Sequence, residues 1–314
     1  MHAQELVLGV DGGGTRTRAV IMDAKHDIIG EGLAGPSNPL RVGVSNAADA
    51  IREAVDRACA AAMVRRAEIV AAEIGLAGVR REDLRMRMRE ELEELGIPKL
   101  EVLTDADIAL YGATDGEQGL VVIAGTGSIC CGKSARGKRA RAGGWGPVAG
   151  DEGSGSWIAR RALQAVARAT DGRGPETSLT AAACDYFNVA TPDDLSMAIH
   201  APSMTDERIA GFCKHVIEAA RDEDQVAREI ADAAGRELGA AAAAVIRKLR
   251  LERESFQVAY VGGVFAAGDL VLEPLRKEIK RIAPKAYLAP PLLPPVVAAA
   301  RLAREHLQDM AVAV

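Results

Sequence analysis

Aromatic side chains and positive charge are both scarce in this chain of 314 residues. It has four Phe, four Tyr and two Trp, and 39 Lys and Arg stand against 44 Asp and Glu, which leaves a formal net charge of −5. A dedicated nucleic-acid binder needs a clustered basic excess to neutralise phosphates, and the chain as a whole lacks one. The composition excludes that class and predicts no nucleic-acid partner.

Paired cysteines and long apolar runs are lacking too. The number of cysteines is odd, and they show no C-x-x-C or Cys/His metal spacing, so we expect reduced thiols (Cys59, Cys130, Cys131, Cys184 and Cys213). The apolar runs fall far short of the ~20 residues that span a bilayer, and the N-terminal segment has no positively charged n-region. We therefore expect a cytoplasmic protein without a membrane partner.

The hydrophobic periodicity of the first third predicts alternating strands and helices. Three short strands come first, joined as an antiparallel meander: Leu6–Val10, Thr17–Met22 and Ile28–Leu33. A helix over Ala47–Met63, capped by Ser45, follows. After it we expect the strand Ile69–Leu76, the helix Arg81–Leu95, the strand Leu100–Leu103 and the helix Asp105–Tyr111. The order is β-β-β-α-β-α-β-α.

The same opening returns after residue 118. Strands are expected over Leu120–Ala124, Ser128–Cys131 and Lys138–Ala142, and then an Ala-rich helical block from about 153 to 250. The strand Gln257–Val261 and the helices Leu270–Ile282 and Pro295–Leu307 complete the chain. A repeated β-β-β opening predicts two similar domains.

Three glycine-rich turns each follow an apolar strand: Asp11–Thr15, Gly125–Ser128 and Gly262–Phe265. Glycine lets the backbone approach a polyanion without a Cβ in the way, and neighbouring hydroxyls can donate to phosphate oxygens. A tight hairpin also needs glycine, so one such turn means little. Three of them at strand ends indicate phosphate binding.

The segment Gly127–Ser134 matches the P-loop pattern G-x-x-x-x-G-K-[ST] letter for letter. A P-loop opens a helix, whereas no amphipathic helix follows Ser134 and the residues Ile129–Cys131 look like a strand. We interpret the segment as an exposed hairpin and expect Lys133 to have no part in nucleotide binding.

Two carboxylates follow strands directly. Asp11 precedes the first glycine turn, where a carboxylate suits Mg²⁺ beside bound phosphates, although a turn-forming role is the alternative. Asp105 and Asp107 open a helix, and either could be an N-cap or lie in the first turn. A carboxylate there also suits a general base, and the spacing does not decide between these roles.

The segment Gly143–Trp157 holds both tryptophans among glycines and polar residues. Such a loop is costly to order unless it binds something, and carboxylates such as Asp151 and Glu152 commonly hold sugar hydroxyls. A turn followed by a helix from Ser154 would explain Glu152 and Trp157. It would not explain Gly144-Trp145-Gly146.

Six motifs in this order carry a resemblance to a known family: DGGGTRTR (Asp11–Arg18), GPSNP (Gly35–Pro39), TDA (Thr104–Ala106), GTGS (Gly125–Ser128), GGWGPVAGDEGSGSW (Gly143–Trp157) and GGVF (Gly262–Phe265). The chain resembles the group of N-acetylglucosamine kinases and BadF/BadG/BcrA/BcrD ATPases within the sugar kinase, Hsp70 and actin superfamily. This resemblance implies an α/β fold of two ribonuclease-H-like, actin-like ATPase lobes with an interlobe cleft. The first lobe would be residues 1–118 with a C-terminal helix 295–312 packing back on it; the second would be 119–294, with a helical insertion at about 153–250.

The resemblance also implies an ATP-dependent sugar kinase that uses ATP and Mg²⁺ and phosphorylates the 6-hydroxyl of an amino sugar, N-acetylglucosamine first and glucosamine next. Asp105 would be the catalytic base and Asp11 the metal-associated carboxylate. ATP would contact Gly12, Gly13, Gly14, Thr15, Thr126, Gly127, Ser128, Gly262 and Gly263. The sugar would contact Asn38, Asp105, Gly144, Trp145, Gly146 and Asp151. A homodimer is expected because it is common in this group.

Two other functions remain open at this point. The activase-type ATPases of the family need a cysteine-ligated iron–sulfur cluster, yet Asp-Ala-Asp-Ile-Ala follows Thr104 and no cysteine flanks that helix. A catalytically idle sugar sensor would be expected to carry a helix-turn-helix module, and only ten residues precede Asp11. The sequence leaves open which sugar is used, the oligomeric state, the pathway, and whether the metal binds directly or through water.

Overall fold

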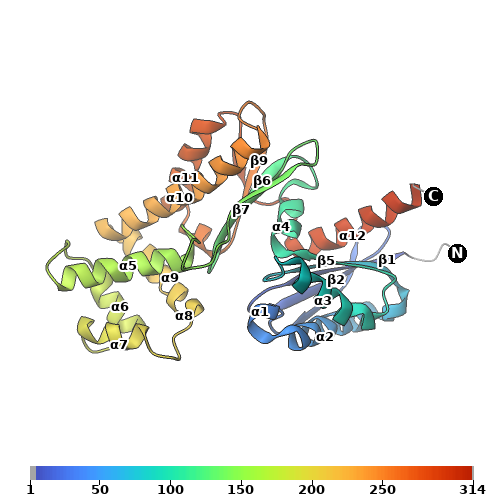
Figure 1. Ribbon diagram of the computed structural model, residues 1–314, viewed down its shortest axis with the longest axis horizontal. Coiled ribbons are helices and arrows are strands. Elements are labelled where there is room, and N and C mark those ends of the chain that lie inside the picture. The colour runs from blue at the N-terminus through green and yellow to red at the C-terminus, as the bar shows by residue number, and fades with distance from the viewer. Residues whose placement is uncertain (1–4, 313–314) are drawn as a thin grey trace. The chain divides into compact units, whose positions relative to one another are not determined.

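The computed structural model describes residues 5–312, and side chains up to residue 308. The chain forms two compact units. Unit 1 is the chain up to Glu117 together with the segment from Pro291 onward, and unit 2 is Gln118–Pro290. Each unit has a five-stranded mixed sheet with helices around it, so the expected α/β class is confirmed (Figure 1).

The sheet of unit 1 has the strand order β3-β2-β1-β4-β5. Its strands are β1 (Leu6–Gly12), β2 (Thr17–Met22), β3 (Ile28–Ala34), β4 (Ile69–Leu76) and β5 (Lys99–Thr104). β1 to β3 are antiparallel, as the meander predicted, whereas β1, β4 and β5 run parallel. The carboxyl ends of these three parallel strands therefore meet at one edge of the sheet.

Helices cover both faces of this sheet. They are α1 (Pro39–Val42), α2 (Val44–Ala62), α3 (Glu82–Leu92), α4 (Asp105–Thr114) and α12 (Pro295–Val312), with short 3-10 turns at Arg66–Glu68 and Glu93–Leu95. Along β1, Leu8 packs into the same core as α2, while Val7 packs into the core formed with α12. Gly9 also faces α12. A Cβ there would lie 2.3 Å from the Ala300 backbone nitrogen, so only glycine lets this helix pack so closely.

The sheet of unit 2 follows a similar plan, with the order β10-β9-β6-β7-β8. Its strands are β6 (Gly119–Ala124), β7 (Ser128–Lys133), β8 (Arg139–Gly143), β9 (Gln257–Val261) and β10 (Tyr287–Ala289). β6 to β8 are antiparallel, and β9 lies parallel to both β6 and β10. Here too, carboxyl ends of neighbouring parallel strands share an edge.

The helices of unit 2 are α5 (Gly155–Thr170), α6 (Leu179–Phe187), α7 (Leu195–Ile199), α8 (Asp206–Gly211), α9 (Cys213–Arg221), α10 (Gln225–Leu249) and α11 (Asp269–Ile282), with 3-10 turns at Pro192–Asp194 and Gly263–Ala267. They share one apolar core with β6, β7 and β9. None of the helices described between Glu5 and Val312 combines the length and the apolar character that a membrane span needs.

Most expected elements are present, and three differ. The helix after β3 begins at Val44 rather than at a Ser45 cap, because the one-turn α1 precedes it and Asn38 caps that turn. The helical block is divided into α5 to α10, and the three-residue β10 had no signal because it is too short to show a period. The P-loop match is a β7–β8 hairpin with a turn at Ser134–Gly137, as expected.

Candidate active site

The carboxyl edge of the sheet in unit 1 brings the two predicted carboxylates together. Asp11 of β1 pairs with Gly75 of β4, which pairs with Leu103 of β5, two residues before Asp105. Two strand spacings of about 4.8 Å separate β1 from β5. The Asp11 charge accordingly reaches Asp105 and contributes to raising its pKa.

The first turn of α4 distinguishes Asp105 from Asp107. Thr104 is the N-cap, and its hydroxyl accepts the Asp107 backbone N–H at 3.2 Å. The Thr104 backbone N–H donates to the Asp107 carboxylate at 3.4 Å, which completes a capping box, and the Thr104 hydroxyl donates to the same carboxylate at 2.7 Å. Asp105 has no part in this box: its carboxylate accepts the neighbouring Ala106 N–H at 2.9 Å. The structure therefore assigns the cap to Thr104 and Asp107 and leaves the Asp105 carboxylate available.

The surroundings of Asp105 make it more basic than an ordinary aspartate. Desolvation by the surrounding protein raises its pKa to about 6; the Ala106 N–H opposes the rise, and the charges of Asp11 and Asp107 add to it. The residue is nevertheless exposed. A carboxylate that is reachable and has a pKa near neutrality suits general-base chemistry.

The first glycine loop (Gly12–Arg16) is braced by the GPSNP segment. Ser37 N–H donates to the Gly13 carbonyl at 3.0 Å, and the buried Thr17 hydroxyl donates to the Gly35 carbonyl at 2.7 Å. A Cβ on Gly12 would lie 2.3 Å from Ser37 Oγ. Thr17 and Ser37 thus hold both loops, although no sequence signal beyond their place in the two motifs marked them.

Asn38 and Arg41 lie beside this loop region. The Asn38 side-chain oxygen accepts the Leu40 N–H at 3.0 Å and caps α1. The same oxygen would be 2.3 Å from a Cβ on Gly78, which follows β4 and has a φ of +86°. Arg41 was not anticipated, and its Nη1 lies 3.1 Å from the position of a Cβ on Gly14. The structure therefore adds a cation next to the first glycine loop.

Asp11 is half-buried at the end of β1. Desolvation raises its pKa, and the charges of Arg18 and Arg16 oppose that rise. Within residues 5–308, no group of three or more His, Cys, Asp or Glu side chains could hold a metal ion unaided. Mg²⁺ that arrives with a nucleotide keeps waters and phosphate oxygens and needs only one or two carboxylates. A lone desolvated carboxylate beside a glycine loop fits that kind of site.

In unit 2, the other two glycine turns lie next to each other. The GTGS loop (Gly125–Ser128) follows β6, and Gly262 and Gly263 follow the parallel strand β9. Gly262 has a φ of +120°, and a Cβ there would lie 2.2 Å from the Ala124 carbonyl oxygen. No other residue type fits so close to the end of β6. The fold thus brings together two glycine turns whose first residues, Gly125 and Gly262, are 137 positions apart in the sequence.

The GTGS loop is anchored by the start of α5. Gly155 N–H donates to the Gly125 carbonyl at 2.8 Å and Ser156 N–H to the Thr126 carbonyl at 3.3 Å. The Ser128 hydroxyl donates to the Glu152 carbonyl at 2.7 Å, so it is engaged inside the protein. Thr126 remains exposed. Within this loop, the Thr126 hydroxyl is therefore the accessible one of the two hydroxyls that the sequence assigned to phosphate.

Asp151 lies beneath the predicted sugar-binding segment. Its side chain is buried, accepts the Ser128 and Gly146 backbone N–H groups, and sits 2.6 Å from the position of a Cβ on Gly127. Burial raises the pKa of Asp151, and those two hydrogen bonds oppose the rise. Trp145, by contrast, is 67 % exposed. The structure brings Gly144, Trp145 and Gly146 together in one exposed loop supported by Asp151; a sugar contact from any of them stays a prediction.

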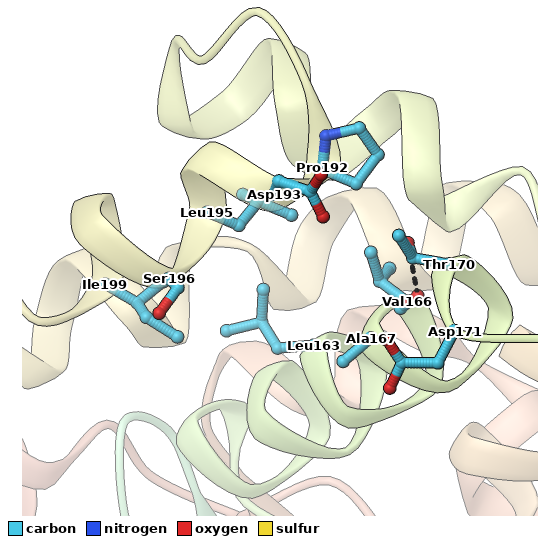
Figure 2. A pocket seen from close by; sticks show the side chains of 10 residues that line it. All are labelled: Leu163, Val166, Ala167, Thr170, Asp171, Pro192, Asp193, Leu195, Ser196 and Ile199. Carbon is cyan, nitrogen blue, oxygen red and sulfur yellow. Dashed lines mark hydrogen bonds between the residues drawn. The ribbon is translucent and has the colours of Figure 1, made fainter. Parts of the chain in front are cut away.

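A separate cavity of about 290 Å³ lies between the second half of α5 and residues 192–199 (Figure 2). Its lining is largely apolar, and the Thr170 hydroxyl turns back to donate to the Val166 carbonyl at 3.0 Å. None of the predicted site residues lines it. This cavity therefore plays no part in the candidate site.

Comparison with known proteins gives the same picture. The family model described as the BadF/BadG/BcrA/BcrD ATPase family matches residues 8–300. An N-acetylmuramic acid/N-acetylglucosamine kinase of Clostridium acetobutylicum is 31 % identical over 280 residues, covering 89 % of this chain and 92 % of the relative. An N-acetyl-D-glucosamine kinase of Dictyostelium discoideum is 30 % identical over 318 residues, covering 96 % and 98 %.

A solved structure is similar over the same range. The crystal structure of a candidate N-acetylglucosamine kinase from Chromobacterium violaceum superposes with a TM-score of 0.79 at 27 % identity, covering 96 % of this chain and 99 % of that one. The expected resemblance is thereby confirmed. With its family model, its relatives and its two mixed sheets in agreement, the chain belongs to the BadF/BadG/BcrA/BcrD ATPase family.

Proposed function

We propose that this protein is an ATP-dependent amino-sugar kinase that transfers the γ-phosphoryl group of ATP to the 6-hydroxyl of N-acetylglucosamine, with glucosamine as the next acceptor. The observation that carries the proposal is the Asp105 carboxylate. It is left out of the α4 capping box, it has a pKa of about 6, and it shares a sheet edge with Asp11 and the first glycine loop. The named activities of the relatives support the choice of acceptor.

Asp105 would act as the general base. Its carboxylate accepts the proton of the acceptor hydroxyl while that oxygen bonds to the γ-phosphorus, and the bond to the β-phosphate oxygen breaks as ADP leaves. Because its pKa is about 6, the carboxylate is largely ionised at pH 7.5 and still basic enough to take the proton. The proton is then released to solvent before the next turnover.

The glycine turns would bind the nucleotide. In unit 1, the Gly13, Gly14 and Thr15 backbone amides are suited to the β- and γ-phosphates. In unit 2, Thr126 and Gly127 offer a second set of donors. Gly262 and Gly263 have no side chain, so the adenosine could approach their backbone closely. Donors held in place before the reaction stabilise the charge that develops on the transferred group.

Asp11 would hold the magnesium ion that accompanies ATP, since it is a desolvated carboxylate next to the phosphate-binding backbone. Bound Mg²⁺ supplies charge neutralisation at the phosphates. The arginines near Asp11 keep it from becoming more basic still, which favours the ionised form that binds a cation.

The acceptor would be bound by Asn38, Asp105, the Trp145 loop and Asp151. The relative from Clostridium acetobutylicum is named for N-acetylmuramic acid as well as N-acetylglucosamine. N-acetylmuramic acid has the same free 6-hydroxyl and carries a lactyl ether at position 3. It is therefore the second acceptor to test.

The deciding experiment is ADP release from Mg·ATP with N-acetylglucosamine, N-acetylmuramic acid, glucosamine, glucose or no sugar. We expect sugar-dependent turnover, and ³¹P–¹H coupling in the product should place the phosphate on C6. Sugar-independent hydrolysis would contradict the proposal and favour an activase-type ATPase. Sugar binding without turnover would favour a sensor. Sedimentation of the same sample tests the expected homodimer.

A further inference from the structure

The Trp145 loop (Gly144–Gly150) contains no helix or strand, and its outer side chains are open to solvent. Trp145 is 67 % exposed and Val148 is 99 % exposed. The conformation of a loop with such exposed side chains depends strongly on the polar contacts that hold it. Those polar contacts therefore set the loop conformation that a ligand would meet.

Three hydrogen bonds that hold this loop come from different parts of unit 2. Gly144 N–H donates to the Ser128 carbonyl at 2.9 Å, and Gly146 N–H donates to the Asp151 carboxylate. Both of these act on the first half of the loop. The third contact comes from Arg160 on α5, whose Nη1 donates to the Pro147 carbonyl. Arg160 is therefore the side chain that holds the middle of the loop.

Arg160 is itself fixed from another direction. Its Nη2 donates to Asp206 Oδ1 at 3.1 Å, and Asp206 is the first residue of α8, a helix of the insertion that packs against α5. Burial raises the pKa of Asp151, and the positive charge of Arg160 is one of the influences that oppose this rise. One guanidinium thus connects the loop, its supporting carboxylate and the helical insertion.

We infer that Arg160 is a positioning residue for the acceptor: it sets the conformation of the Trp145 loop, and Asp206 orients it. This inference rests on the proposed function only for the identity of the ligand, because the contacts themselves lie within unit 2. It gives the helical insertion a role in acceptor recognition.

The chemistry requires arginine at this position. A guanidinium presents two parallel donors, so one can reach a carbonyl and the other a carboxylate, whereas the single lysine nitrogen cannot serve both in the same geometry. The pair is one-third to one-half exposed, and exposed ion pairs contribute little to folding stability. Replacing Arg160 should therefore disturb the loop without unfolding the protein.

The next residue along α5 offers a matched control. Arg161 is also an exposed arginine, but its guanidinium lies 5.1 Å from the centre of the Trp157 ring. An Arg161→Ala variant removes the same charge one position away and leaves the three loop contacts in place.

The test compares Arg160→Ala, Arg160→Lys, Asp206→Asn and Arg161→Ala in steady-state kinetics. For Arg160→Ala we expect the acceptor KM to rise about tenfold or more, with kcat changed less than about threefold and the KM for ATP unchanged. Arg160→Lys should not restore it, Asp206→Asn should give a smaller rise, and Arg161→Ala should match the parent. An unchanged acceptor KM in Arg160→Ala, or an equal rise in both KM values, would overturn the inference.

A second measurement does not depend on turnover. In a Trp157→Phe background, Trp145 is the one remaining tryptophan, and its fluorescence reports on the loop. Arg160→Ala in that background should increase the quenching of Trp145 by acrylamide, with the melting temperature unchanged. If the parent enzyme phosphorylates no sugar, the proposed function fails, and this assay still decides whether Arg160 holds the loop. Equal quenching with and without Arg160 would refute its positioning role.

Discussion

Units 1 and 2 are built on similar five-stranded sheets, yet they offer opposite chemistry at the carboxyl ends of their parallel strands. Unit 1 presents Asp11 and Asp105, whose pKa values are raised mainly by desolvation. Unit 2 presents glycine backbone, and its buried Asp151 is satisfied by two backbone N–H groups. The carboxyl ends of the parallel strands can therefore present reactive carboxylates in one unit and backbone groups suited to ligand binding in the other.

Local backbone structure explains the contrast. Asp105 occupies the first position of α4, and its carboxylate is left out of the capping box that Thr104 and Asp107 form; it accepts only N–H groups of its own turn, those of Ala106 and of Asp105 itself. Asp151 has a φ of +60° and a carboxylate tied to Ser128 and Gly146. The first is left free to react, whereas the second is used to order a loop.

The two aspartates in the first turn of α4 are expected to differ most, because substitution of Asp105 should lower kcat and substitution of Asp107 should lower stability. Asp105→Asn should lower kcat by about a thousandfold with the acceptor KM little changed, because the variant lacks only the base. Asp107→Asn should instead lower the melting temperature by a few degrees, because a lost cap costs about 1 kcal/mol, and it should keep most of its kcat. Coupled ADP detection and thermal melts measure both.

The melting temperature also reports on the charge of Asp105. Its pKa is raised in the folded state, so its ionised form costs stability above about pH 6. Asp105→Asn should therefore melt at or above the temperature of the parent protein at pH 7.5, and the difference should shrink as the pH falls toward 4. A large drop in melting temperature would show that the lost activity reflects unfolding.

The next largest expected effect is the change of kcat/KM with pH. A base must be deprotonated to act, so kcat/KM for the acceptor should rise about tenfold per pH unit below an apparent pKa near 6 and level off above it. Rates between pH 4.5 and 8, with the fold checked at each pH, measure this. A rise centred near pH 4 would mean that the base has an ordinary aspartate pKa and is not Asp105 as described.

Neighbouring glycines of unit 2 give a smaller effect, on stability. Gly262→Ala should destabilise the fold by roughly 2 kcal/mol or more, because its φ of +120° is unfavourable for a side chain and a Cβ would lie 2.2 Å from the Ala124 carbonyl. Gly263→Ala has no atom within 4 Å of the added Cβ and should change stability by less than about 0.5 kcal/mol. Urea unfolding of both variants is the measurement; equal losses would contradict the close approach of β9 and β6.

The smallest effect is expected at the P-loop match. Lys133 ends β7 in a hairpin rather than opening a helix, so Lys133→Ala should change kcat and the KM for ATP less than about twofold. The same steady-state assay tests this. A loss of ATP binding would show that unit 2 uses the hairpin for phosphate after all.

Much of the fold could be predicted from the sequence, because most of its strands are regular. β1, β2, β4, β6 and β9 are buried almost throughout, so apolar runs between glycines located them to within two residues. α1 and β10 are only four and three residues long, which is less than the window a periodic signal needs. The division of the helical block depends on packing between helices, which local propensity does not record.

The residues of the candidate site could be predicted from the sequence only in part. Glycine turns and carboxylates after strands are sequence signals, and they identified Asp11, Asp105 and the glycine loops. Thr17, Ser37 and Arg41 were missed as functional or bracing residues, since their partners are other loops that only the fold brings near. Arg160 was missed for the same reason, because its contacts are with Pro147 and Asp206.

The fold class, the order of the strands along the chain, the glycine turns and the family could be predicted from the amino-acid sequence, because they depend on local periodicity and on contiguous motifs. Which carboxylates are used for hydrogen bonds within the protein could be seen only in the folded structure. Asp105 and Asp151 are both aspartates in glycine- or helix-flanking segments, and they differ in the backbone N–H groups and in the charges that surround them in the folded chain. Asp11, whose charge raises the pKa of Asp105, and Ser128, whose N–H donates to Asp151, are both distant in sequence from the carboxylate they affect, so the role of a carboxylate is a property of the folded chain.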